Sequence, residues 1–97
     1  MNPAKYCSDE LDRRIIDHLI EHHADGTTKI AKALGLKPES GRHIIGKRLE
    51  KMRCLSEADT WHILTFHPER KEGKFRAWWL TLEDIDIEAW RKSRVRT

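Results

Sequence analysis

The sequence predicts a mainly helical α+β fold, with a three-helix core, a two-stranded β-hairpin and a C-terminal helix. Apolar residues recur at helical spacing in three early segments, and β-forming residues gather in two later runs, 61–68 and 75–81. A chain of 97 residues fits one domain with one modest core. We expect this domain to span residues 9–92, between a flexible N-terminus at 1–8 and a basic flexible tail at 93–97.

Residues 9–23 are predicted to form the first helix. Apolar side chains recur there at a spacing of four, which gives an amphipathic helix one apolar face. Ser8 suits the N-cap position, and the acidic residues of the first turn favour the positive end of the helix dipole. The turn at Gly26 is expected to end the helix.

Two further helices are predicted in the segment that follows. The second begins at Thr27 or Thr28, either of which can cap it, and ends at Gly35, which readily takes the left-handed conformation. The third is expected over residues 38–53, because a proline suits the first helical turn and apolar residues then share one face.

Gly41 and Gly46 lie inside this third predicted helix. Each weakens a helix by about 1 kcal/mol relative to alanine. They mark either a loop before the helix or a close approach of the backbone to a partner. Residues 54–60 are then expected to form a linker.

Two β-rich runs follow the linker. WHILTFHP and FRAWWLT flank the polar segment ERKEGK, whose glycine marks a turn. Together they predict a hairpin whose basic turn region, at residues 67–76, forms a wing. A last helix is expected to begin after Thr81 and to end in basic residues near residue 92.

Charge is segregated along the chain. Residues 27–53 carry eight basic and two acidic side chains, and residues 67–76 carry four basic and two acidic ones. Residues 1–26 carry three basic and six acidic side chains, whereas residues 77–90 carry four acidic and no basic ones. This segregation is typical of a phosphate-binding surface, and the plainer interpretation is a solvated surface of mixed charge.

The segments IAKALGL (30–36) and IGKRLEKM (45–52) resemble winged helix-turn-helix regulators, such as the leucine-responsive and multiple-antibiotic-resistance families of bacteria. The resemblance covers about residues 9–81 and implies a winged-helix fold that binds double-stranded DNA. The chain departs from these families in the longer spacing between Leu36 and Ile45, which requires an extra helical turn or an expanded turn.

A DNA-binding role predicts a contact with DNA for each group of basic residues. The N-terminal turn of helix 38–53 would enter the major groove, where Arg42 is the strongest candidate because a guanidinium can bond bidentately to guanine. The wing would follow the phosphate backbone or reach a minor groove. The candidates are Thr28, Lys29 and Lys37 near flanking phosphates, Ser40, Arg42, His43 and Lys47 at base edges, and Arg70, Lys71, Lys74 and Arg76 in the wing. The predicted function is sequence-specific binding of double-stranded DNA by a transcriptional regulator.

The alternative is a winged-helix protein–protein interaction module that does not bind DNA. In that interpretation the basic third helix docks on an acidic protein surface. Trp78 and Trp79 point to opposite faces of one strand, so one of them needs cover from the last helix or from a second subunit. Together with Trp90 they give reason to expect a homodimer, which would bind two half-sites about one DNA turn apart.

Other classes of function lack support in the sequence. It has no P-loop, nucleophile elbow or nucleophile–base pair, so no catalytic residue, enzymatic activity or cofactor is predicted. His18 and His22 have a spacing that can bind a metal, but no further ligand accompanies them and no metal site is predicted. No apolar run reaches the length of a membrane span, and Cys7 and Cys54 form no paired motif, which favours a cytoplasmic protein with free thiols.

Overall fold

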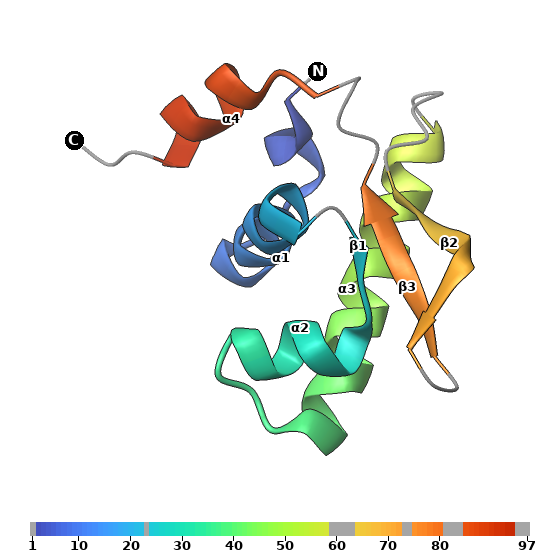
Figure 1. Cartoon of the computed structure of the whole chain (residues 1–97). Coiled ribbons are helices and arrows are strands. Elements are labelled where there is room, and N and C mark those ends of the chain that lie inside the picture. Colours follow the sequence, from blue (N-terminus) through green and yellow to red (C-terminus); the bar gives the residue numbers. More distant parts are fainter. Residues whose placement is uncertain (1, 23, 59–63, 73–74, 81–84, 95–97) are drawn as a thin grey trace.

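The computed structural model describes residues 2–22, 24–58, 64–72, 75–80 and 85–94. For residue 24, and for the described residues between 64 and 80, it describes the backbone alone. The elements are a 3-10 helix η1 (Pro3–Tyr6), α1 (Glu10–His22), β1 (Ala24–Asp25), α2 (Thr27–Ala33), α3 (Pro38–Ala58), β2 (Leu64–Glu72), β3 (Phe75–Leu80) and α4 (Ile87–Arg94). The long helix α3 runs along the molecule, with α1 and α2 on one side of it and the β2–β3 hairpin on the other (Figure 1).

The first helix is capped by Asp9 rather than by Ser8, the predicted cap. Oδ1 of Asp9 accepts a hydrogen bond from the backbone N–H of Asp12 at 3.1 Å. Oδ2 of Asp12 in turn accepts from the backbone N–H and the hydroxyl of Ser8, at 2.8 and 2.7 Å. Asp9 thereby satisfies an N–H group that the helix itself leaves without a partner, and Asp12 holds Ser8 against the first turn.

The turn between α2 and α3 confirms the predicted role of Gly35. Its φ of 79° is left-handed. Its N–H donates to the carbonyl of Lys32 at 3.1 Å, and the N–H of Leu36 donates to the carbonyl of Ala31 at 2.9 Å. This pair of bonds is a Schellman motif, which ends a helix by satisfying its last carbonyl groups. At the other end of α2 the cap is Gly26, so the predicted threonine caps are wrong.

The third helix runs to Ala58, so residues 54–58 are helical and the linker predicted there is wrong. Arg53 forms ion pairs with Glu50 and with Glu57, which lie three and four residues away on the same face. Ser56 is fully buried, and its hydroxyl donates to the carbonyl of Arg53 at 2.8 Å. These contacts stabilise the last turns, which the sequence pattern alone did not indicate.

Gly41 lies where α3 packs against α2 and the turn after it. A Cβ at this position would lie 2.9 Å from the Cβ atoms of both Ala31 and Leu36. At Gly46 a Cβ would meet only a methyl group of Thr27, at an ordinary 3.9 Å. Gly41 therefore lies inside α3 and marks a close approach of α3 to α2, so the loop expected as one alternative is wrong.

The β structure corrects the predicted fold class. The described chain is mainly helical, and its strands form one antiparallel three-stranded sheet in the order β1-β3-β2. Ala24 pairs with Trp79 and Asp25 with Trp78, so a strand that the sequence did not predict occupies the second edge of β3. The expected class, a three-helix core with a two-stranded β-hairpin wing and a C-terminal helix, is therefore wrong. It missed β1, because a two-residue strand is too short to show alternating polarity.

The hairpin is also built differently from the prediction. Strand β2 extends to Glu72, through most of the segment expected to be a turn, and Glu72 pairs with Phe75. The register shifts between the Phe66–Trp78 pair and the Lys71–Arg76 pair, so that β2 carries extra residues opposite β3. The irregularity includes Pro68, which has no N–H to donate to a ladder.

Both ends of the described chain pack onto the domain. Pro3 and Tyr6 of η1 are buried, which corrects the expected flexible N-terminus. Helix α4 begins later than predicted and extends to Arg94, a residue that the sequence placed in the flexible tail. Trp90 is only 2% exposed, and its indole Nε1–H donates to Asp17 of α1 at 2.7 Å. It closes the domain and therefore gives no argument for a homodimer; the side chains of Trp78 and Trp79 lie outside the described part.

The core joins all the helices. Its buried hydrophobic residues are Tyr6, Ile15, Ile16, Leu19, Ile30, Ala31, Ile45, Leu49, Met52, Ile85 and Trp90. Those of α1 and α3 recur at the spacing that the sequence pattern predicted. This apolar face of α3 is turned toward α1 and α2, and the β2–β3 hairpin contacts the helix from the other side (Figure 1).

Candidate nucleic-acid interface

The basic segment of the sequence forms one end of the molecule. Helix α2 and the first turns of α3 lie side by side there, and the hairpin end of β2 and β3 points to the same end (Figure 1). The exposed residues of α2, α3 and the intervening turn include Lys29, Lys32, Lys37, Ser40, Arg42, His43, Lys47 and Lys51, with Thr28 partly exposed. We call this set the α2–α3 face.

Several lysines of the α2–α3 face are not neutralised by the described carboxylates. Among the described residues, Lys32, Lys37, Lys47 and Lys51 form no ion pair. Arginines elsewhere behave differently, since Arg48, Arg53 and Arg94 each contact two carboxylates. Positive charge on this face therefore remains available to an external anion.

Arg48 is turned away from that face and joins α3 to the start of α1. Its Nη1 lies 2.5 Å from Oδ2 of Asp9 and 3.3 Å from Oδ1 of Asp12, whose carboxyl is 1% exposed. The hydrogen bond from Arg48 lowers the pKa of Asp9, and the same bond raises the pKa of Arg48. Arg48 therefore pairs with the acidic start of α1, and it does not add its charge to the α2–α3 face.

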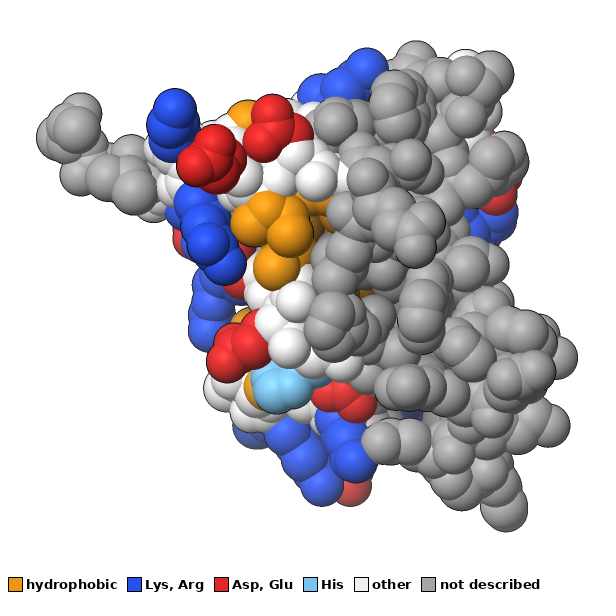
Figure 2. Space-filling view, turned by 45° about the horizontal axis from the view of Figure 1, so that its top comes forward, with side chains coloured by type: hydrophobic (Ala, Val, Ile, Leu, Met, Phe, Trp, Pro, Cys, Tyr) orange, Lys and Arg blue, Asp and Glu red, His pale blue; other side chains and the backbone are white. Residues whose placement is uncertain are grey.

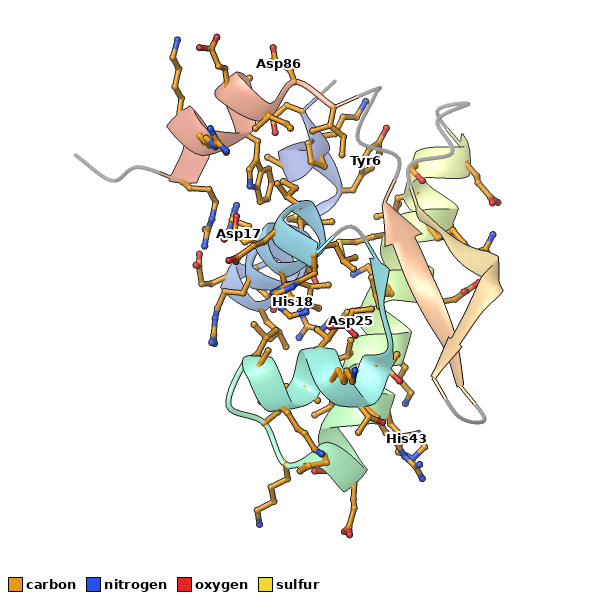
Figure 3. The ribbon with its side chains drawn as sticks, viewed as in Figure 1. Tyr6, Asp17, His18, Asp25, His43 and Asp86 are labelled. Atoms are coloured by element: carbon orange, nitrogen blue, oxygen red, sulfur yellow. The ribbon has the colours of Figure 1, made fainter. Side chains whose placement is uncertain are left out.

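The predicted base-edge residues share the start of α3. Figure 3 shows His43 projecting outward from the helix, away from α1 and α2. Ser40, His43 and Lys47 follow one another at helical spacing, and Ile44 lies among them with 42% of its surface exposed. Ile44 was not among the site residues that the sequence predicted.

The wing residues are only partly defined. Arg70 and Lys71 lie on β2 and Arg76 lies on β3, where Lys71 and Arg76 are register partners. Their side chains, and all of Lys74, lie outside the described residues. The strands place these backbone positions near the hairpin end that points toward the start of α3 (Figure 1).

The surface over α1 and α4 carries charges of both signs, unlike the α2–α3 face. Basic and acidic side chains alternate along its edge, around a small hydrophobic group (Figure 2). Arg94 contributes to this balance, because it contacts Asp17 at 2.9 Å and Glu10 at 2.6 Å. The hydrogen bonds that Arg94 donates to Glu10 and to Asp17 raise its pKa. This surface is therefore a poorer match for a polyanion than the α2–α3 face.

The two histidines of α1 contact each other and, through His18, Asp25. Nε2 of His18 lies 2.7 Å from Oδ2 of Asp25, and the ring centroids of His18 and His22 lie 4.3 Å apart. The described residues contain no group of three or more potential ligands placed to hold a metal ion. Asp25 also accepts from the N–H of Gly26 at 2.9 Å, so the pair links α1 to the start of α2.

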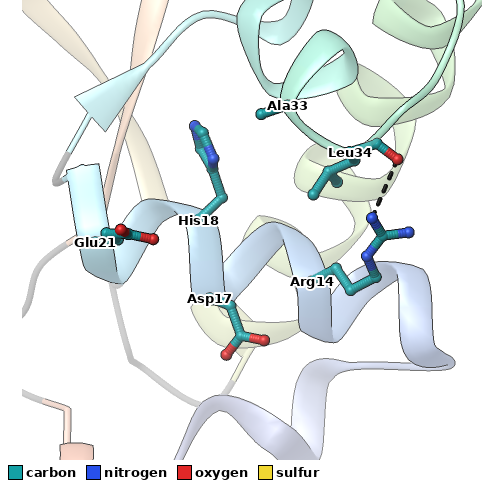
Figure 4. A pocket seen from close by; sticks show the side chains of 6 residues that line it. All are labelled: Arg14, Asp17, His18, Glu21, Ala33 and Leu34. Atoms are coloured by element: carbon teal, nitrogen blue, oxygen red, sulfur yellow. Dashed lines mark hydrogen bonds between the residues drawn. The ribbon is translucent and has the colours of Figure 1, made fainter.

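A shallow pocket of about 230 Å³ lies beside this pair. It is lined by Arg14, Asp17, His18, Glu21, Ala33 and Leu34, with Arg14 donating to the carbonyl of Leu34 at 3.1 Å (Figure 4). The cavity is open to solvent and lined by charges of both signs. It offers neither an enclosed apolar surface nor convergent polar groups for a small ligand.

The two cysteines are expected to differ sharply in reactivity. Burial raises the pKa of the Cys7 thiol to about 12, whereas Cys54 is exposed on α3. Because the thiolate is the nucleophile, we expect Cys7 to react with N-ethylmaleimide at pH 8 about tenfold or more slowly than Cys54. Timed mass spectrometry of the Cys7→Ser and Cys54→Ser variants measures each rate. Equal rates in the folded protein would contradict the described packing of η1.

Within the described residues, no helix combines the length and apolar character that crossing a membrane requires. No known protein family matches the chain, and no match is found among curated proteins or solved structures.

Proposed function

We propose that this protein binds double-stranded DNA through the α2–α3 face, as a sequence-specific transcriptional regulator. The observation that carries the proposal is the group of lysines on this face that no described carboxylate neutralises, namely Lys32, Lys37, Lys47 and Lys51. Lysine and arginine that contact phosphates release condensed counterions, and this release supplies most of the affinity of non-specific DNA binding. The proposal includes the cytoplasmic location expected from the sequence.

Helix α3 is suited to entering a major groove. That groove is about 12 Å wide and admits one α-helix. The start of α3 lies at the end of the molecule, and it carries Ser40, His43 and Lys47 on its exposed side. Lys37 precedes the helix and lies near enough to this start to contact a flanking phosphate. The N-terminal turns would therefore face base edges, while the lysines around them face the backbone.

The test is fluorescence anisotropy of a labelled random-sequence 30-mer duplex, titrated with protein at several salt concentrations. We expect the double variant Lys37→Ala/Lys47→Ala to bind about tenfold or more weakly at roughly 0.1 M salt. The slope of log affinity against log salt should become shallower by about 0.9 for each phosphate that the variant no longer neutralises.

The matched control is Arg91→Ala/Lys92→Ala. It removes the same charge from two exposed positions on α4, at the opposite end of the molecule from the start of α3. We expect it to bind like the wild-type protein. Equal losses in both double variants would mean that net charge alone drives binding. No binding by the wild-type protein at low salt would remove the proposal.

A protein-binding role is the second candidate. It is favoured by Ile44 and Leu55, two exposed apolar side chains that lie on one stripe of α3. That role predicts a partner with an acidic surface, because the same stripe carries Lys47 and Lys51. It also predicts that the anisotropy titration gives no binding at any salt concentration.

A further inference from the structure

Ile44 is a side chain that the fold does not explain. It and Leu55 are the large hydrophobic residues that remain exposed in the described part of the chain, at 42% and 43%. Ile44 lies in the second turn of α3, outside the core that Ile45 and Leu49 form. Isoleucine is not favoured at exposed helical positions, because its branched side chain loses rotamer freedom there. Within the part of the chain whose side chains are described, neither packing nor helix propensity therefore accounts for Ile44.

The neighbours of Ile44 are polar or basic. Ser40 lies one turn before it, Lys47 lies nearly one turn after it, and His43 precedes it directly. A hydrophobic protein surface that covered Ile44 would also remove Lys47 from water without supplying an anion. The major groove offers the opposite arrangement, with phosphates along its walls and base edges on its floor.

The floor of the major groove carries one apolar group. Thymine projects its C5-methyl group there, and neither cytosine nor uracil carries this methyl group. We propose that Ile44 contacts thymine methyl groups and is a specificity-determining residue of the α2–α3 face. This inference rests on the proposed function. It adds that the α2–α3 face selects thymine at the base pair that Ile44 contacts.

Leu55 is not expected to take part. It lies eleven residues beyond Ile44, which is about 16 Å along the helix axis. That distance exceeds the width of a major groove, so a helix that enters by its N-terminal turns leaves Leu55 outside. Leu55 is thus a matched control, since it has similar exposure on the same helix.

The experiment replaces thymine by deoxyuridine, which removes the methyl group and leaves the hydrogen-bonding edge unchanged. A preferred duplex is first selected from a random library by the wild-type protein, and each thymine is then replaced singly. Anisotropy titrations compare the wild-type protein with Ile44→Ala, Ile44→Val and Leu55→Ala. Circular dichroism shows that each variant is folded.

We expect at least one replacement to weaken wild-type binding about fourfold, the effect of one buried methyl group. Ile44→Ala should bind the thymine and deoxyuridine duplexes equally, and Ile44→Val should keep part of the preference. Leu55→Ala should keep the full preference.

The possible failures are distinguishable. If the wild-type protein binds no duplex at low salt, the proposed function and this inference are both wrong. If it binds with a steep salt dependence but ignores every deoxyuridine, or selects a site without thymine, only this inference is wrong. An undiminished preference in Ile44→Ala would assign the methyl contact to another side chain and overturn the inference.

Discussion

Trp90→Ala is expected to lower the free energy of unfolding by about 3–5 kcal/mol, the usual cost of removing a buried aromatic side chain. Trp90 is 2% exposed and is the buried residue of α4. Its indole N–H also donates to Asp17 at 2.7 Å, and the truncation removes that hydrogen bond. Because α4 has only eight residues, it depends on this packing for its stability.

Urea denaturation followed by circular dichroism measures this loss. Trp90→Phe is the matched variant, since it keeps an aromatic ring in the core and removes the hydrogen bond. We expect it to cost about 1–2 kcal/mol, and it stays measurable even if Trp90→Ala unfolds. A loss below about 1 kcal/mol in Trp90→Ala would contradict the docking of α4 on α1.

Gly41→Ala is expected to destabilise the protein although alanine is the better helix former. The added Cβ would lie 2.9 Å from the Cβ atoms of Ala31 and Leu36, both of which are fixed to the backbone. Overpacking of this kind costs about 1–3 kcal/mol, which exceeds the roughly 1 kcal/mol gained in helix propensity. We expect a net loss of up to about 2 kcal/mol and a Tm lower by up to about 10 °C.

Gly46→Ala is the control for this prediction. It makes the same chemical change in the same helix, but the new Cβ meets only a methyl group of Thr27 at 3.9 Å. The gain in helix propensity then remains, and we expect a stabilisation of up to about 1 kcal/mol. Thermal melts of the two variants should shift in opposite directions. Shifts of equal sign would show that helix propensity or chain entropy, and not the contact with α2, governs both positions.

Sequence patterns predicted the features that depend on local interactions. Helix α1 was predicted within one residue at each end, and the left-handed Gly35 was predicted from the freedom of glycine to take positive φ. The inward face of α3 followed from apolar spacing, and the exposed basic residues of the α2–α3 face followed from what that spacing leaves outside.

Candidate site residues were predicted unevenly for the same reason. Ser40, His43 and Lys47 stand on the exposed face of α3, where helical periodicity places them. Ile44 was not predicted as a site residue, because periodicity alone does not separate a residue at the edge of an apolar face from one within it. The wing positions depend on the hairpin register, and the shift between Phe66 and Lys71 has no signature in a period-two pattern.

The sequence by itself determined where the main helices lie and that positive charge gathers on α2 and α3, because helix formation, capping and composition act over a few residues. Only the tertiary structure decided that β1 joins the sheet, that Tyr6 is buried, and that Trp90 binds Asp17 across 73 positions of the chain. These contacts join residues that are distant in sequence, so their energies appear only once the core has brought the elements together.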